Sequence, residues 1–370
     1  MRRSFYRTFA CLLSLLPLPN MASEPSRQEQ AWSVTLENDL FFGTDRHYTN
    51  GIQLEWSQHF PQGQDTGEES LLFRGMCEAV GCVGMNTTLV RHRVGQLMYT
   101  PQNISIREPQ PDDRPWAGML YYSSERTFSD AANKEEVRLI AQIGAVGPIA
   151  KAGQTQKLVH DTFSGDDPLG WGNQIGNELG LLLMLEKRRA IEGLSFTWPS
   201  DVEMRAVRHW RVAVGTIMTF VGAGMEVTFG KNLTDIPARP GDIEIKKKRS
   251  PRVVPMSSSG LQAESSLPVR RSCVFDWLEC SLAASLEARL MAYNIFLDGP
   301  VFRRGPSVKS RPLVLDAVLA ARLTFPRSRT ASCGPLFIQF KVTQRSPEFR
   351  SSRKIPSQTY GALTVGQTFW

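Results

Sequence analysis

The chain has 370 residues, of which 41% are hydrophobic and 21% charged, and its formal net charge is +7. After the first twenty or so residues, no stretch holds the roughly 18 consecutive apolar residues of a membrane-spanning helix, which excludes a helical membrane protein. The length suits two soluble domains or one large closed barrel, so the pattern of residues along the chain has to decide between them.

The first residues have the features of a secretory signal peptide. An arginine-rich start precedes an apolar run over residues 9–18 and small residues around Ala22. Because this run is too short for a membrane helix, we interpret residues 1–22 as a signal peptide that is cleaved near Ala22. For an exported chain, the positive charge favours an anionic lipid surface as a partner and argues against nucleic acid.

Apolar and polar residues then alternate along most of the chain, the pattern of a strand whose two faces meet different environments. Ile52, Leu54 and Trp56, for example, alternate with polar side chains. Several such segments reach ten or more residues, as in tilted strands that cross a membrane, whereas strands of a soluble sandwich are shorter. The pattern predicts twelve strands, over residues 31–38, 50–58, 90–98, 117–125, 135–146, 178–188, 205–218, 220–230, 280–295, 311–325, 334–345 and 359–369.

An even number of strands, charged residues on one strand face and an aromatic C-terminal strand are typical of outer-membrane barrels. The last strand here reads TYGALTVGQTFW. We therefore predict an all-β fold, a transmembrane antiparallel β-barrel of about 12 strands over residues 31–370. We expect a multi-pass, monomeric protein in the outer membrane of a Gram-negative cell. Residues 231–279, which contain KKKRSPRVVPMSSSG, have the composition of a linker and predict a disordered or loop insertion.

If both termini lie in the periplasm, strand order assigns every loop to one end of the barrel. The outer loops are then 39–49, 99–116, 147–177, a short turn near 219, 296–310 and 346–358. Three of them carry most of the unusual polar residues, in ENDLFFGTDRHYTNG, in GQLMYTPQNI with DDRPWAG, and in GPIAKAGQTQKLVHDTFSGDDPLGWGNQIGNE. A hairpin turn needs far fewer polar residues. Since loops on one rim can converge, we predict a functional site there.

Five cysteines remain once the signal peptide is removed. In an oxidising compartment, the close pairs Cys77/Cys82 and Cys273/Cys280 could form local disulfides and leave Cys333 over. The sequence alone does not decide either pairing. No array of cysteine and histidine predicts a zinc site, and no phosphate-binding loop or GxSxG motif is present.

The loop motifs ENDLF, TDRxYTNG, GQxxYTP, DDRPxAG, GxxGP, QxxxH, GWxNQ and NE occur in one order along residues 31–188. In this order they resemble the lipid A 3′-O-deacylase family of outer-membrane enzymes. The remainder of the chain matches that family only as a barrel. The resemblance implies a twelve-stranded barrel with Ca²⁺ as cofactor and lipid A as substrate. It implies hydrolysis of the ester of the 3′-linked acyloxyacyl chain.

The resemblance also implies which residues act. Asp166 fits best the acidic residue expected shortly after the histidine of QxxxH, and it would bind the metal together with Asn38. The catalytic residues carried over by the motifs are Asn38, Asp39, Thr49, Gln156 and His160.

The chemistry of these side chains is consistent with that implication. Ester hydrolysis near neutral pH needs a base, and histidine is the side chain suited to that pH. Of the five histidines after the signal peptide, only His47 and His160 fall in the motif-bearing outer loops. We interpret His160 as the base and His47 as an exposed loop residue.

Oxygen atoms are the ligands that Ca²⁺ prefers, and Asn38, Asp39, Asp166 and Asp167 supply them. Asp39 could instead orient His160. A plainer alternative is that Asn38 and Asp39 only shape a turn, and that the GDDP sequence caps a helix or is a solvated loop.

Arg114, in DDRPWAG, is a candidate substrate-binding residue for a lipid A phosphate. The alternative is a salt bridge to Asp112 or Asp113 that locks the loop. Two other functions compete with the deacylase, namely a non-catalytic barrel such as a porin or adhesin, and an outer-membrane phospholipase. A phospholipase is expected to place a serine nucleophile beside its histidine. The matched motifs contain no such serine, so we expect water as the nucleophile.

Overall fold

A computed structural model of the chain describes residues 29–42, 47–60, 70–163, 167–199, 201–240, 242, 278–325, 334–352 and 355–369, apart from the side chains of Leu40 and Phe163. The signal peptide predicted for residues 1–22 lies outside these residues. So do Asp166 and most of the insertion predicted for 231–279. Within the described part, no helix has the length and apolar character needed to cross a membrane.

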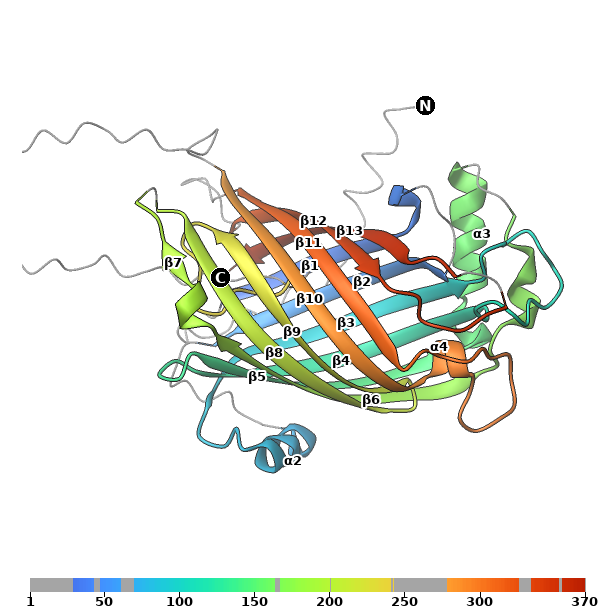
Figure 1. Cartoon of the computed structure of the whole chain (residues 1–370), viewed down its shortest axis with the longest axis horizontal. Coiled ribbons are helices and arrows are strands. Elements are labelled where there is room, and N and C mark those ends of the chain that lie inside the picture. The colour runs from blue at the N-terminus through green and yellow to red at the C-terminus, as the bar shows by residue number, and fades with distance from the viewer. Residues whose placement is uncertain are drawn as a thin grey trace, which may run out of the picture.

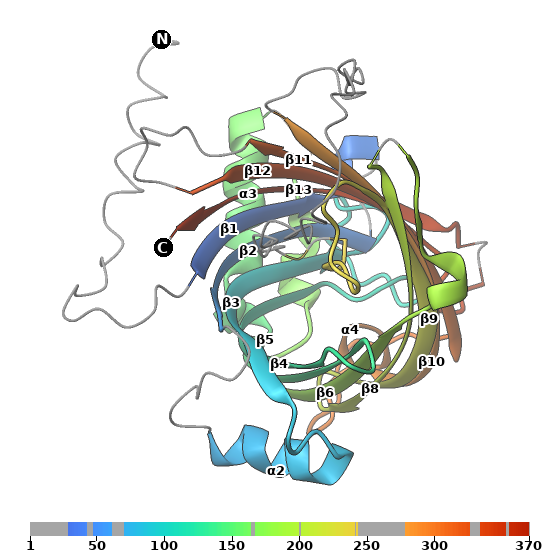
Figure 2. The same cartoon turned by 90° about the vertical axis from the view of Figure 1, so that its left-hand side faces the viewer.

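Twelve long strands in the described part form one closed antiparallel barrel, as predicted (Figures 1 and 2). Each long strand pairs with the next along the chain, and β1 pairs with β13 to close the barrel. The two-residue strand β7, Phe196–Thr197, pairs with β8. The long strands are β1 Glu29–Asn38, β2 His47–His59, β3 Asn86–Thr100, β4 Ala117–Asp130, β5 Glu135–Val146, β6 Glu178–Ala190, β8 Glu203–Gly215, β9 Met218–Gly230, β10 Glu279–Asn294, β11 Leu313–Phe325, β12 Leu336–Arg345 and β13 Gln358–Phe369.

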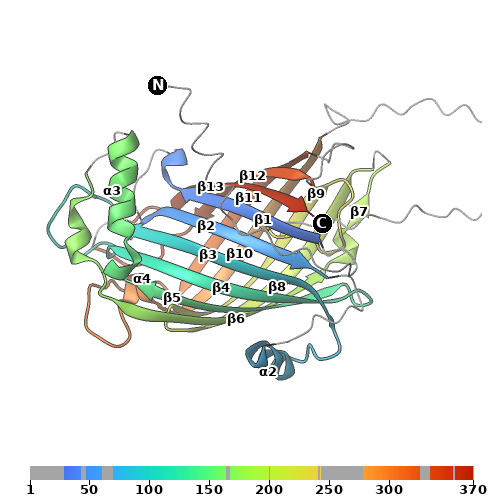
Figure 3. The same ribbon diagram turned by 180° about the vertical axis from the view of Figure 1, so that it is seen from behind.

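Helices occur only in the connections of the described chain. They are α2 Leu71–Val80, α3 Ala152–Phe163 and α4 Ile295–Asp298, with short 3₁₀ turns at Leu40–Phe42, Pro148–Ala150, Leu169–Asn173 and Glu192–Leu194. α3 and α4 lie at one end of the barrel, and α2 and β7 lie at the other (Figures 1 and 3). This confirms the division of the connections between two ends. The turn predicted near residue 219 is in fact at residues 216–217.

The two faces of each strand differ in chemistry. One face carries charges that pair inside the barrel, such as the guanidinium of Arg91, which lies 3.0 Å from Glu55 and 2.8 Å from Glu125. The other face exposes apolar side chains such as Val94 and Ile143. An apolar outer wall around a polar interior is the arrangement of a barrel embedded in the outer membrane.

The segment that follows β9 enters the barrel lumen (Figure 2). The guanidinium of Arg239 pairs with Glu186 on β6 and lies 3.0 Å from Glu226 on β9. The carboxylate of Asp242 lies 2.7 Å from Arg138 on β5. Burial raises the pKa of Asp242, but Arg91, Arg138 and Arg93 outweigh burial and hold it well below its usual range. The described start of the predicted insertion therefore has no helix or strand, but it is fixed by charge pairs.

Candidate active site

α3 stands against the membrane-facing side of the barrel wall at the outer rim (Figure 3). On β3, Gln96 shares a face with the exposed Val94, and its Nε2 donates a 2.6 Å hydrogen bond to the carbonyl of Ala150, just before α3. On β4, a Cβ at Gly118 would lie 2.4 Å from the Cβ of Ala152. Glycine is therefore required at residue 118 for the first turn of α3 to approach the wall. The start of α3 therefore packs on the outward face of β3 and β4, the face that does not line the lumen.

The buried face of α3 carries the QxxxH motif. Ala152, Gln156 and His160 follow one another at intervals of four residues, so they share one face of the helix, and all three are buried. Lys157 and Asp161, on the opposite side, are exposed and pair with each other at 3.0 Å. The helix thus holds Gln156 and His160 between itself and the barrel.

Gln156 is fixed through only one end of its amide group. Its Oε1 accepts a 2.7 Å hydrogen bond from the indole Nε1 of Trp171. Its Nε2 is buried and has no hydrogen-bond partner among the described residues. The oriented amide therefore presents a hydrogen-bond donor to a group that enters the site.

The ENDLF and YTNG motifs meet where β1 and β2 end. Asn38, the last residue of β1, pairs with Asn50 on β2. Asp39 is fully buried, and its backbone N–H contacts the carbonyl of Thr49 at 3.5 Å. The hydroxyl oxygens of Thr49 and Thr100 lie 2.6 Å apart, which ties β2 to the end of β3. The two groups of predicted catalytic residues are therefore both anchored to β3, one through Thr100 and one through Gln96.

The oxygen donors of this rim suit a calcium ion by chemical type, because Asn38 and Asp39 offer an amide and a carboxylate. Asp167 is described and exposed. In the part of the chain that the structure describes, no three histidine, cysteine or acidic side chains form a cluster suited to a metal. The predicted ligand Asp166 lies outside that part, so the calcium site stays a prediction.

Arg114 is buried and pairs with a residue that the sequence did not indicate. Its Nη2 lies 2.6 Å from the carboxylate of Glu348, in the outer loop between β12 and β13. The predicted alternative of a salt bridge to Asp112 or Asp113 was wrong about the partner, since Asp113 accepts its hydrogen bond from the backbone N–H of Arg114. Burial raises the pKa of Glu348, but Arg114 and Arg345 outweigh burial and lower it to about 2. Arg114 thus locks two outer loops together.

His47 does not lie exposed in its loop, and that interpretation was wrong. It is 3% exposed, its Nδ1 lies 3.8 Å from Asp113, and its ring meets the edge of Phe349 at 5.5 Å between centroids. Loops from two distant parts of the chain, which contain Asp113 and Phe349, pack against it. His47 is therefore a packing residue of the rim.

Two residues of the site were missed although their motifs were recognised. Trp171, from GWxNQ, orients Gln156, and a Cβ at Gly153 on α3 would lie 2.8 Å from its ring. Thr100, from GQxxYTP, holds Thr49. Both residues belong to recognised motifs, which was the only sign of their importance in the sequence. Their roles could not be assigned without knowing which side chains they contact.

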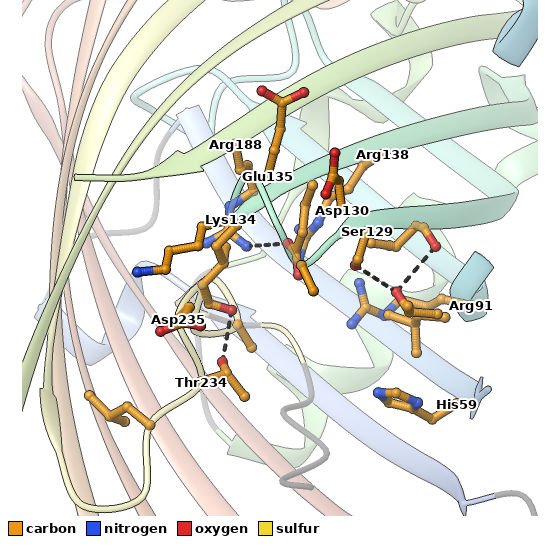
Figure 4. A pocket seen from close by; sticks show the side chains of 18 of the residues that line it. His59, Arg91, Ser129, Asp130, Lys134, Glu135, Arg138, Arg188, Thr234 and Asp235 are labelled. Carbon is orange, nitrogen blue, oxygen red and sulfur yellow. Dashed lines mark hydrogen bonds and ion pairs between the residues drawn. The ribbon is translucent and has the colours of Figure 1, made fainter. Parts of the chain in front are cut away.

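A cavity of about 350 Å³ lies at the other, periplasmic end, and none of the residues that line it belongs to these motifs. Figure 4 shows its lining side chains. Arg91, Arg138 and Arg188 line it. Each of them is already paired with a carboxylate, as in the 2.6 Å contact from Arg188 to Glu226. These cations neutralise carboxylates of the barrel interior, so we do not place the predicted ester hydrolysis in this cavity.

Comparisons with known proteins identify the family of this chain. The family model described as outer membrane protein LpxR matches residues 8–369. Among solved structures, LpxR from Salmonella typhimurium is similar with a TM-score of 0.62 and 18% identity, over 92% of this chain and 100% of that chain. The β domain of the Bordetella autotransporter BrkA is similar at a TM-score of 0.39 and 9% identity, over 92% of this chain and 98% of that chain. This similarity is too low to support a conclusion. The search of curated proteins gave no match. The chain belongs to the LpxR family of outer membrane proteins, and the family resemblance of its loop motifs is confirmed.

Proposed function

We propose that this protein is a calcium-dependent outer-membrane hydrolase that removes the 3′-linked acyloxyacyl chain of lipid A by hydrolysing its ester. The observation that carries the proposal is the burial of Gln156 and His160 between α3 and the membrane-facing side of the wall. Lipid A resides in the outer leaflet, so its acyl chains reach such a site from the side, without entering the lumen. Membership of the LpxR family supports the same substrate.

In this proposal each residue has a distinct task. His160 takes the proton from the attacking water and gives it to the sugar oxygen as the ester C–O bond breaks, and Asp39 holds the imidazole in position. Gln156 donates from Nε2 to the ester oxygen on which negative charge develops, and Thr49, fixed by Thr100, lines the same site. Asn38 and Asp166 would hold Ca²⁺, which when bound polarises the ester carbonyl.

The two competing functions fit the observations less well. A porin needs an open lumen, whereas the charged segment with Arg239 and Asp242 lies inside the lumen of this barrel. A phospholipase is expected to use a serine, whereas the matched motifs contain no serine, and the hydroxyls of Thr49 and Thr100 in these motifs are bonded to each other. With His160 as a base and no serine beside it in the motifs, the site suits an attack by water.

Mass spectrometry of lipid A tests the proposal. Cells that express the wild-type protein should contain lipid A that lacks the 3′ acyloxyacyl chain, and cells with an empty vector should not. A His160→Gln variant present at the same level in the outer membrane should leave lipid A intact. Intact lipid A with the folded wild-type protein would contradict the proposal, and loss of phospholipid acyl chains instead would point to a phospholipase.

A further inference from the structure

α2 lies on the outside of the barrel wall, at the end opposite α3 (Figures 1 and 3). Its buried side chains Phe73 and Cys77 pack against Phe128 on β4 and Val137 and Leu139 on β5. Along β5, Val137 and Leu139 alternate with Arg138, whose side chain points into the lumen, so they belong to the outward face. α2 therefore covers part of the wall that would otherwise meet lipid.

The apolar surface of α2 is wider than the stripe that docks on the wall. Successive helical residues are rotated by about 100° around the axis. Leu72 and Val80 consequently lie on one side of the docked stripe, and Arg74 and Glu78 lie on the other. Leu72 and Val80 are 47% and 38% exposed, while Arg74 and Glu78 pair with each other at 3.3 Å. Docking on the barrel leaves an apolar flank uncovered beside a charged flank.

The outward face of the wall on which α2 packs indicates what covers this flank. From Val137 and Leu139 towards the outer rim, that face continues with exposed Ile143 on β5 and exposed Leu181 and Leu183 on β6. This is the surface that faces lipid in an outer-membrane barrel, and the flank of α2 extends it towards the periplasm. The guanidinium of Arg126 lies 4.9 Å from the ring centroid of Phe73, which places a cation at the edge of the helix. A cation beside apolar side chains complements phosphate headgroups above acyl chains.

The turn after α2 is held in place by two local features. Gly81 ends the helix in the left-handed conformation, and a disulfide joins Cys77 to Cys82. Beyond the disulfide, Val83 is 70% exposed. This disulfide is one of the two pairings that the sequence left open. It holds the chain after the helix close to α2, so the apolar Val83 follows directly after a fixed residue.

We propose that α2 is an interfacial helix that binds phospholipid of the inner leaflet of the outer membrane. Leu72, Val80 and Val83 insert at the level where acyl chains meet headgroups, and Arg74 and Glu78 remain in water. Amphipathic helices with a wide apolar face adopt this position in the plane of a membrane. The proposal concerns the periplasmic end of the barrel and does not depend on the activity of the outer rim.

Photo-crosslinking from within the helix tests the proposal. The full chain, with benzoylphenylalanine in place of Leu72 or, as the matched control, of Glu78, is reconstituted into vesicles of phosphatidylethanolamine and phosphatidylglycerol that contain a fluorescent phospholipid. Heat-modifiable migration on a gel verifies that each variant has folded. We expect several times more labelled lipid on the Leu72 variant than on the Glu78 variant.

Two outcomes of the crosslinking experiment overturn the proposal. Equal lipid labelling at both residues would show that the apolar flank does not reach the bilayer. A crosslink from Leu72 to a second copy of the chain, with no lipid attached, would assign the flank to a dimer interface. A Leu72→Ser, Val80→Ser double variant supplies a second measurement, since amides of α2 should exchange with deuterium several times faster than wild type in vesicles. Unchanged exchange would also contradict the proposal.

Discussion

Replacement of Glu348 by glutamine should release the outer loops without unfolding the barrel. The carboxylate of Glu348 lies 2.6 Å from Arg114 Nη2 and is 9% exposed, so solvent screens the pair little. Burial raises the pKa of Glu348, but Arg114 and Arg345 outweigh it and lower the pKa from 4.5 to about 2. This difference corresponds to about 3 kcal/mol, at roughly 1.4 kcal/mol for each tenfold change in proton affinity. The loops should therefore open on the order of 100 times more often in Glu348→Gln.

Hydrogen exchange of the folded protein in detergent measures this opening. At neutral pH, amides of residues 99–116 should exchange faster in Glu348→Gln than in wild type, while amides of the strands should be unchanged. Glu192→Gln is the matched control, because Glu192 forms an exposed 3.0 Å pair with Lys134 at the other end of the barrel, and such pairs contribute little. Equal exchange of residues 99–116 in Glu348→Gln and wild type would refute the reasoning.

The pH dependence of the wild-type protein provides an independent check on the same pair. Because the pKa of Glu348 is lower in the folded state, the charged carboxylate stabilises the loops fully above pH 4.5. That stabilisation is lost as the pH falls towards about 2. Wild-type loops should accordingly loosen over this range in limited proteolysis with an acid protease. Glu348→Gln, which has no charge to lose, should show a smaller change, and an identical response in both proteins would contradict the assignment.

Three further predictions concern the reaction and the barrel. His160→Gln should lose roughly 3 to 5 kcal/mol of transition-state stabilisation in the release of 3′ acyl chains, while it still migrates as a folded barrel. The control Lys157→Gln, on the exposed face of α3, should keep wild-type turnover. Chelation with EGTA should abolish acyl release and calcium should restore it, and Asp166→Ala should raise the calcium requirement; full activity in EGTA would remove calcium from the mechanism. Deletion of residues 359–370 removes most of β13, which pairs with β1, so heat-modifiable protein should disappear from outer-membrane fractions, and normal insertion would count against the closure described.

The strands were predictable because their pattern is local and repeated. The fifth strand was predicted over 135–146, where β5 occurs, since a strand between lipid and a polar lumen must alternate. The turn between β8 and β9 was misplaced by a few residues because GTIMTF contains no strong turn signal. α2 was missed because ten residues with a central glycine give a weak helical pattern, and its stability comes from the wall and the disulfide.

The site could be predicted only as far as motifs reach. Order along the chain identified Gln156 and His160, and the structure brings both to the buried face of one helix. The partner of Arg114 could not be found in this way, because Glu348 lies 234 residues further along the chain, outside every recognised motif. The burial of His47 likewise arises from two distant loops that pack against it, which no local pattern specifies.

Asp242 is attached to opposite sides of the barrel, so its full set of contacts depends on closure of the barrel. Its carboxylate pairs with Arg93 on β3 and Arg138 on β5, while its backbone carbonyl accepts a hydrogen bond from Arg322 on β11. These strands face one another across the lumen only after β1 has paired with β13. The contacts of Asp242 to both sides of the lumen can therefore exist together only in the closed barrel, where the segment after β9 forms an internal strut between them.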